Sequence, residues 1–145
     1  LLEKKKKGYE MTPVLYILMR TDLGSMNPGK AMAQASHASN AFVHSAEPGY
    51  NVDEKLFEEW RQSTTQGFGT VLVLGVNEAQ MRTAVDVVFN CGVDKFPCDI
   101  IHDPTYPLQD GDTTHFIPVD TCGYIFGDKD NVLLQSILGN FELHY

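Results

Sequence analysis

Side chains able to do chemistry are concentrated in the segment GKAMAQASHA, residues 29–38. On a helix, Lys30, Gln34 and His37 are spaced by four and three positions, so they line one face. An amine, an amide and an imidazole near a helix N-terminus are suited to holding a phosphate or an oxyanion. The same spacing is typical of a helix with a solvated polar face, so spacing alone leaves both interpretations open.

A second polar segment spans residues 103–120, which hold three prolines and four aspartates. We interpret it as a loop, and loops of this length in compact domains are usually functional or mobile. The segment and its flank contain histidines and carboxylates that could bind a divalent ion, namely His102, Asp103, Asp110, Asp112 and His115. Their spacing fits no helical or EF-hand pattern, so a solvated acidic loop is favoured and no metal is predicted.

Apolar runs and helix caps divide the rest of the chain into alternating strands and helices. Strands are predicted at residues 14–20, 69–74, 96–101 and 121–126. Helices are predicted at residues 28–44 after an Asn27 cap, from residue 54 after an Asp53 cap, from an Asn77 cap to Gly92, and at residues 130–138 before Gly139. Leu56, Phe57 and Trp60 share one helical face and are predicted to lie in the core.

This order predicts an α/β fold, a three-layer α/β/α sandwich with a mixed, mostly parallel sheet of about four strands. In such sheets ligands bind beyond the carboxyl ends of the strands. We therefore expect the segment before Lys30 and the segment that begins at His102 to form the site, with Lys30 and Asp103 close together.

Composition restricts the class of protein further. The 145 residues carry a net charge of −8, and no apolar run approaches the ~20 residues that span a bilayer, so no membrane association is predicted. The three cysteines form no CxxC pair, which favours free, buried or half-buried thiols in a reducing cytoplasm. We interpret residues 1–10, with their four lysines, as a flexible leader or tag remnant and residues 11–145 as one domain.

Several motifs occur in the order of a known family. The segments RTDL (residues 20–23) and GKAMAQASHA resemble the first strand and helix of the type 2 peptidyl-tRNA hydrolases of archaea and eukaryotes. The segment CDIIHD resembles that family's strand ending in Asp, and TCGYIFG (residues 121–127) resembles its TVLGIGP strand. The resemblance is specific at the first helix and looser elsewhere.

The resemblance implies hydrolysis of the ester between peptide and tRNA, with no cofactor, peptidyl-tRNA as the partner and a possible homodimer. It also implies that Lys30, Asp103 and Thr121 are catalytic. Substrate binding is assigned to Arg20, Gln34, His37 and Thr105. The aspartate could activate or orient water, the lysine could stabilise an oxyanion or hold a phosphate, and the threonine hydroxyl could position water or a tRNA hydroxyl.

Charge keeps two alternatives open. Binding of tRNA draws most of its affinity from cations, whereas acidic residues outnumber lysines nine to two between residues 94 and 145. One alternative is a catalytically impaired homologue that binds a protein or small ligand. The other is an enzyme that acts on a different ester or amide.

Overall fold

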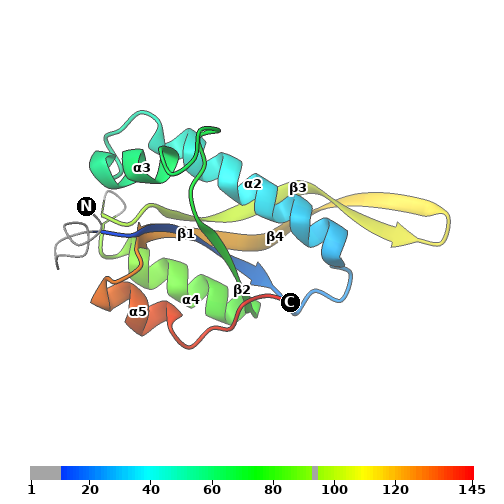
Figure 1. Cartoon of the computed structure of the whole chain (residues 1–145). Coiled ribbons are helices and arrows are strands. Elements are labelled where there is room, and N and C mark those ends of the chain that lie inside the picture. Colours follow the sequence, from blue (N-terminus) through cyan, green and yellow to red (C-terminus); the bar gives the residue numbers. More distant parts are fainter. Residues whose placement is uncertain (1–10, 93–94) are drawn as a thin grey trace.

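A four-stranded sheet forms the centre of the fold (Figure 1). The computed structural model describes residues 11–92 and 95–145, and the leader predicted at residues 1–10 lies outside them. The strands are β1 (Pro13–Arg20), β2 (Val71–Val76), β3 (Cys98–Asp110) and β4 (Thr113–Asp128). The helices are α2 (Pro28–Ala46), α3 (Glu54–Arg61), α4 (Glu78–Phe89) and α5 (Val132–Leu138). No helix in these two ranges is long and apolar enough to cross a membrane.

Strand order in the sheet is β2-β1-β4-β3. Strand β1 is parallel to β2 and antiparallel to β4, and β3 and β4 are antiparallel to each other. The α/β fold class with a mixed sheet is confirmed. The parallel content is lower than expected, because β3 and β4 are joined by a tight turn rather than by the crossover helix that parallel strands require.

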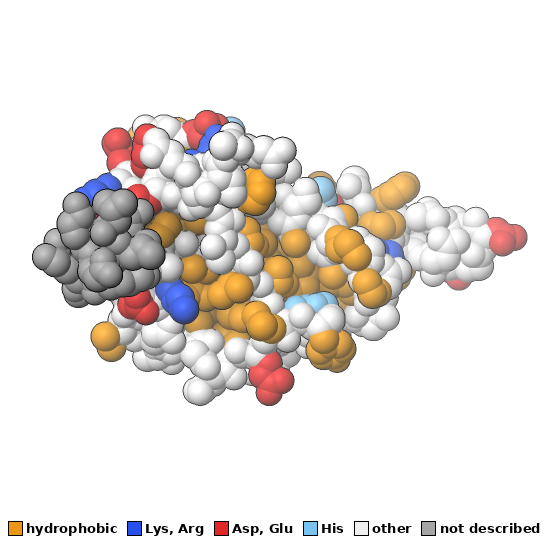
Figure 2. All heavy atoms as spheres, in the orientation of Figure 1, with side chains coloured by type: hydrophobic (Ala, Val, Ile, Leu, Met, Phe, Trp, Pro, Cys, Tyr) orange, Lys and Arg blue, Asp and Glu red, His pale blue; other side chains and the backbone are white. Residues whose placement is uncertain are grey.

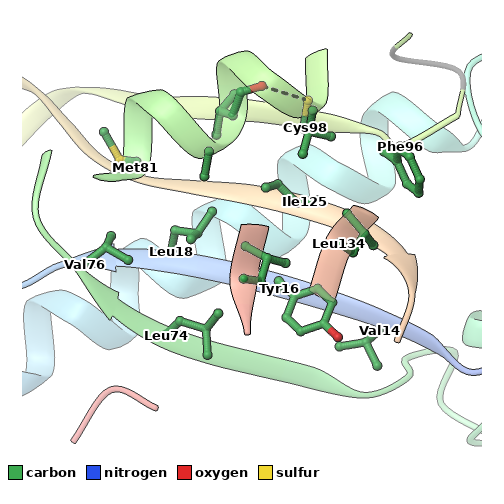
Figure 3. Packing of buried hydrophobic residues seen from close by; sticks show 14 residues of the cluster. Val14, Tyr16, Leu18, Leu74, Val76, Met81, Phe96, Cys98, Ile125 and Leu134 are labelled. Atoms are coloured by element: carbon green, nitrogen blue, oxygen red, sulfur yellow. Dashed lines mark hydrogen bonds between the residues drawn. The ribbon is translucent and has the colours of Figure 1, made fainter. Parts of the chain in front are cut away.

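The two helical layers cover opposite faces of this sheet (Figure 1). On the α2 side, a core cluster centres on Phe42, Trp60 and Phe126, which confirms the prediction that Trp60 is buried. On the α4 and α5 side, Tyr16 and Leu134 belong to a second cluster (Figure 3). Strand β1 feeds alternate side chains into both clusters, as expected for a strand that is covered on both faces.

Helix starts agree with the capping residues seen in the sequence. The side chains of Asn27 and Asp53 accept hydrogen bonds from the first backbone N–H groups of α2 and α3. Asn77 and Gln80 form a reciprocal capping box at the start of α4. These caps fix where α2 begins, and therefore which turn of the helix carries Lys30.

The prediction of a loop at residues 103–120 is wrong. Strands β3 and β4 continue through it as a hairpin that turns at Gly111, where φ is 61°, and that projects past both helical layers (Figure 1). Most hairpin side chains beyond Tyr106 are exposed. Because both faces are solvated there, the sequence lacks the alternation of apolar and polar residues that marks a half-buried strand.

The outer edge of β2 is paired with residues near the C-terminus. The Gly75 N–H donates to the Glu142 carbonyl at 2.9 Å, and the His144 N–H donates to the Val73 carbonyl at 2.8 Å. Hydrophobic side chains gather between the two helical layers on the face that Figure 2 presents. The pairing of β2 with Glu142 and His144 occupies part of a sheet edge that would otherwise be free to pair with another chain.

Candidate active site

A chain of three buried polar side chains connects α2 to the two hairpin strands. The Thr121 hydroxyl donates to Gln34 Oε1 at 2.7 Å, and Gln34 Nε2 donates to Asp103 Oδ2 at 2.7 Å. The residues are 0%, 2% and 7% exposed, respectively. Buried polar groups are costly unless they are hydrogen-bonded, so this chain fixes the orientation of all three side chains. Three residues predicted for the site are thus brought together.

Asp103 is held on its other oxygen by its own strand. The Thr105 N–H donates to Asp103 Oδ1 at 2.9 Å, with the Thr105 hydroxyl at 3.4 Å, and His37 Nε2 lies 4.0 Å from Oδ2. Burial alone would raise the pKa of Asp103. The hydrogen bonds from Gln34 and Thr105, with the nearby His37, outweigh burial and lower the pKa below its ordinary value of 3.8. Asp103 is therefore ionised at neutral pH.

This lowered pKa makes the contribution of Asp103 to stability pH-dependent. A carboxyl with a depressed folded-state pKa stabilises the fold above its unfolded-state pKa and loses that effect as the pH falls through the folded-state value. We expect the difference in unfolding free energy between wild type and Asp103→Asn to stay constant from about pH 7 to 5 and to shrink below about pH 4. Urea unfolding across this range measures it, and a difference that grows on acidification would contradict the expectation.

Lys30 lies on the same side of the sheet as Asp103 but binds backbone carbonyls. Its Nζ donates to the Pro107 carbonyl at 2.7 Å and to the Ser25 carbonyl at 3.1 Å, and it lies 5.1 Å from the centre of the Tyr106 ring. Within residues 11–92 and 95–145, no direct hydrogen bond or ion pair joins Lys30 to Asp103. An ammonium carries three N–H groups, so one remains for a ligand.

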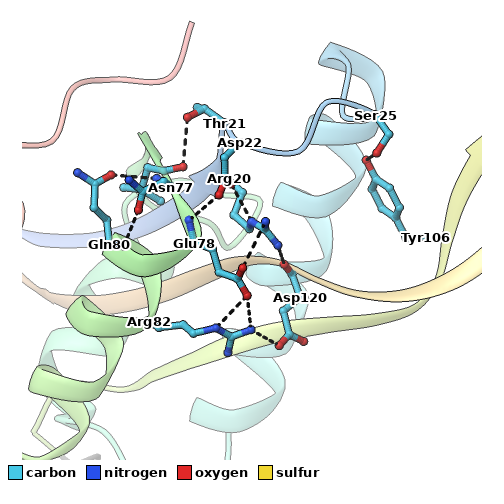
Figure 4. Close-up of polar contacts among 11 residues, drawn as sticks. Arg20, Thr21, Asp22, Ser25, Asn77, Glu78, Gln80, Arg82, Tyr106 and Asp120 are labelled. Carbon is cyan, nitrogen blue, oxygen red and sulfur yellow. Dashed lines mark hydrogen bonds and ion pairs between the residues drawn. The ribbon is translucent and has the colours of Figure 1, made fainter.

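Two side chains at the edge of the site were not predicted. The hydroxyls of Ser25 and Tyr106 are 3.0 Å apart and connect the segment before α2 to the base of the hairpin (Figure 4). Tyr106 was missed because its segment was interpreted as a loop. Its 1% exposure shows that the hairpin strand starts inside the core, and an aromatic residue between two prolines was the only sequence signal for it.

The other predicted binding residues divide between the rim and a separate network. The His37 side chain is 53% exposed and is accessible to a ligand at the rim, next to Asp103. Arg20 does not join this group. Its Nε lies 2.9 Å from Asp22 Oδ1, its Nη2 lies 3.6 Å from Glu78, and its Nη1 donates to the Asp120 carbonyl at 3.0 Å (Figure 4).

The candidate metal ligands do not gather in the structure. His102 Nδ1 contacts Asp120 Oδ1 at 2.7 Å, whereas His115 pairs with Asp110 at 3.6 Å near the hairpin turn. In the described part of the chain, no three His, Cys, Asp or Glu side chains are arranged to hold a metal ion.

The cysteines do not supply a nucleophile to this site. All three cysteines are unpaired, as predicted. Cys98 and Cys122 are also buried as predicted, whereas Cys91 is exposed. Burial raises the pKa of Cys98 to about 11 and that of Cys122 to about 12, so both thiols stay protonated at neutral pH.

Fold and site together define an α/β domain whose polar side chains meet between the first long helix and a β-hairpin. The model of the family described as peptidyl-tRNA hydrolase PTH2 matches residues 13–143, nearly the whole chain. The protein therefore belongs to the peptidyl-tRNA hydrolase PTH2 family, which confirms the resemblance seen in the sequence. No individual curated protein matches the chain significantly.

Proposed function

We propose that the protein hydrolyses the ester bond between peptide and tRNA in peptidyl-tRNA and releases free tRNA. Membership of the PTH2 family supports the substrate class. The observation that carries the proposal is the ionised Asp103 carboxylate, oriented by Gln34 and Thr105 within a site that also contains Lys30. A cytoplasmic location, a homodimer and a single domain at residues 11–145 stay predictions from the sequence.

Asp103 and Lys30 are the proposed catalytic residues. Asp103 accepts a proton from water, whose oxygen bonds to the ester carbonyl carbon. The remaining N–H of Lys30 stabilises the negative charge that develops on the carbonyl oxygen or holds a nearby phosphate. The bond between the carbonyl carbon and the ribose oxygen then breaks, and the ribose oxygen takes the proton from Asp103 to become a hydroxyl. The peptide leaves as a carboxylic acid, and the Asp103 carboxylate is restored.

Thr121 and Gln34 act through Asp103 in this proposal. Thr121 is 0% exposed and donates its proton to Gln34, so it is a positioning residue rather than a group that touches substrate. Gln34 is 2% exposed; the hydrogen bond from Thr121 fixes the orientation of its amide, and the amide in turn orients the Asp103 carboxylate. His37 and Thr105, at the edge of the site, are the proposed substrate-binding residues.

The test is peptide release from a purified peptidyl-tRNA, followed across salt concentrations. If two or three phosphates are contacted, raising salt from about 50 to about 200 mM is expected to raise KM roughly tenfold. Binding of the protein displaces cations from the tRNA, and this displacement becomes less favourable as the salt concentration rises. A KM that does not change with salt would contradict phosphate contacts. Hydrolysis of an uncharged ester at a comparable rate would favour the alternative of an enzyme that acts on a different ester or amide.

The binding-module alternative is supported by the charge of the molecule. The net charge is −8, and the exposed Asp110 and Asp112 make the hairpin tip acidic (Figure 2). Such a surface repels nucleic acid at a distance. The same assay separates the two functions, since an impaired homologue releases no peptide at any salt concentration, whatever it binds.

A further inference from the structure

Thr121 lies in an irregular part of the β3–β4 ladder. Ile101 pairs with Cys122 and the next residue, His102, pairs with Asp120, so Thr121 is an extra residue on β4. A β-bulge of this kind re-aims side chains. Consecutive side chains of a regular strand point to opposite faces, but here Cys122 and Thr121 both face α2. Without the bulge, the Thr121 hydroxyl would point away from Gln34.

Arg20 binds the backbone at this bulge. The pairing of β1 with β4 ends at Met19 and Cys122, and one residue further along β1 the Arg20 guanidinium donates to the Asp120 carbonyl at 3.0 Å. This carbonyl belongs to the peptide group that joins Asp120 to Thr121. Where the backbone pairing of β1 with β4 stops, the Arg20 side chain thus supplies the next hydrogen bond to β4. This side chain is only 11% exposed.

Charged neighbours hold both partners of this contact. Asp22 lies 2.9 Å from Arg20 Nε, and Glu78 lies 3.6 Å from its Nη2. The Asp120 carboxylate lies 2.7 Å from Arg82 of α4 (Figure 4). It also lies 2.7 Å from His102 of β3. Hydrogen bonds from Arg82 and His102 lower the pKa of Asp120, so the carboxylate stays charged at neutral pH.

We propose that Arg20 is a positioning residue, which fixes the bulge that turns Thr121 toward Gln34 and thereby orients Asp103. The proposal rests on the proposed hydrolysis and assigns to Arg20 a role other than contact with tRNA phosphate. Two carboxylates already neutralise its charge, a carbonyl accepts from its Nη1, and its side chain is only 11% exposed, so Arg20 is less suited to a phosphate than an exposed, unpaired arginine. The planar, forked donor group of Arg suits this arrangement, whereas the point charge of Lys does not.

The kinetic experiment compares Arg20→Lys and Arg20→Gln with wild type in the peptide-release assay. We expect both variants to lose kcat by roughly 10- to 100-fold with KM unchanged, since misplacement of a catalytic group costs rate rather than affinity. A phosphate contact would give the opposite pattern, with KM raised in Arg20→Gln, kcat preserved and Arg20→Lys close to wild type. That pattern, or normal kinetics in both variants, would overturn the proposal.

The matched control is Arg61→Gln. This arginine lies on α3 and pairs with Glu47 at 3.9 Å, far from the bulge in the fold, and its substitution changes the net charge by the same amount. We expect its kcat and KM to equal those of wild type. Thermal unfolding of all three variants shows whether any loss of kcat comes from an unfolded fraction.

A readout independent of catalysis is the NMR signal of the Gln34 side-chain amide. This amide donates to Asp103 while its oxygen accepts from Thr121, so its protons are expected to exchange slowly with solvent in wild type. We expect faster exchange and a shifted signal in Arg20→Gln but not in Arg61→Gln. If wild type releases no peptide, the proposed hydrolysis fails while this signal still decides the role of Arg20. An unchanged signal in Arg20→Gln would refute the positioning role.

Discussion

Asp103→Asn is expected to slow peptide release by about 10²- to 10⁴-fold, the usual contribution of a general base. Asn keeps the shape of the side chain but cannot accept a proton from water. It also has a single acceptor oxygen, whereas the carboxylate accepts from both Gln34 and the Thr105 N–H. Single-turnover release from peptidyl-tRNA measures the loss, and urea unfolding at neutral pH shows that the variant is folded.

Lys30→Ala provides the second arm of this experiment. Its ammonium lies at the start of α2 and is tied to the carbonyls of Pro107 and Ser25, so its removal takes away the proposed oxyanion donor and loosens the hairpin. Lys55→Ala removes an exposed lysine of α3 and is expected to leave release unchanged. Full activity in both Asp103→Asn and Lys30→Ala would remove the proposed roles of the two residues.

Local signals were sufficient for most helices and inner strands. Asn27, Asp53 and Asn77 were identified as caps because short polar side chains before an apolar pattern satisfy the first N–H groups of a helix. Trp60 was assigned to the core from its spacing with Leu56 on one helical face. In both cases the information lies within one or two turns of the chain.

Strand direction depends on residues distant in sequence and was predicted less well. Parallel β1 and β2 follow from the connecting helices, but β3 and β4 are antiparallel because the solvated hairpin around Gly111 reverses the chain. Pro104, Pro107 and Pro118 argued against strands there. Proline is tolerated in this hairpin because β3 is an edge strand and because β4 extends beyond the end of β1.

The candidate site was predicted as a set of residues but not as a geometry. Helical spacing placed Lys30 and Gln34 on one face, and the family resemblance added Asp103 and Thr121. The order of the hydrogen bonds and the burial of Thr121 depend on a one-residue bulge, which leaves no periodic signal in the sequence. For Arg20, its type suggested a tRNA contact, whereas its partners come from three separate segments of the chain.

The largest expected effect on stability is that of Trp60→Ala, which should lower the free energy of unfolding by about 3–5 kcal/mol. The Trp60 ring is 1% exposed, and its centre lies 5.3 Å from that of Phe42 and 6.1 Å from that of Phe126. Its Nε1 donates to the Thr70 carbonyl at 2.8 Å, just before β2. The substitution therefore leaves a cavity beside Phe42 and removes one of two donors to the Thr70 carbonyl, which keeps its hydrogen bond from the Leu15 N–H at 3.0 Å.

Urea unfolding of Trp60→Ala, followed by circular dichroism, measures this effect, and Tyr50→Ala is the matched aromatic control. Tyr50 is 81% exposed, so its removal is expected to change the unfolding free energy by less than about 0.5 kcal/mol. Gln34 and Lys30 lie in the first two turns of α2, while Phe42 lies near its other end, so folded Trp60→Ala should keep the kcat of wild type. A stability loss within about 1 kcal/mol of zero would mean that Trp60 is not the centre of the α2-side core.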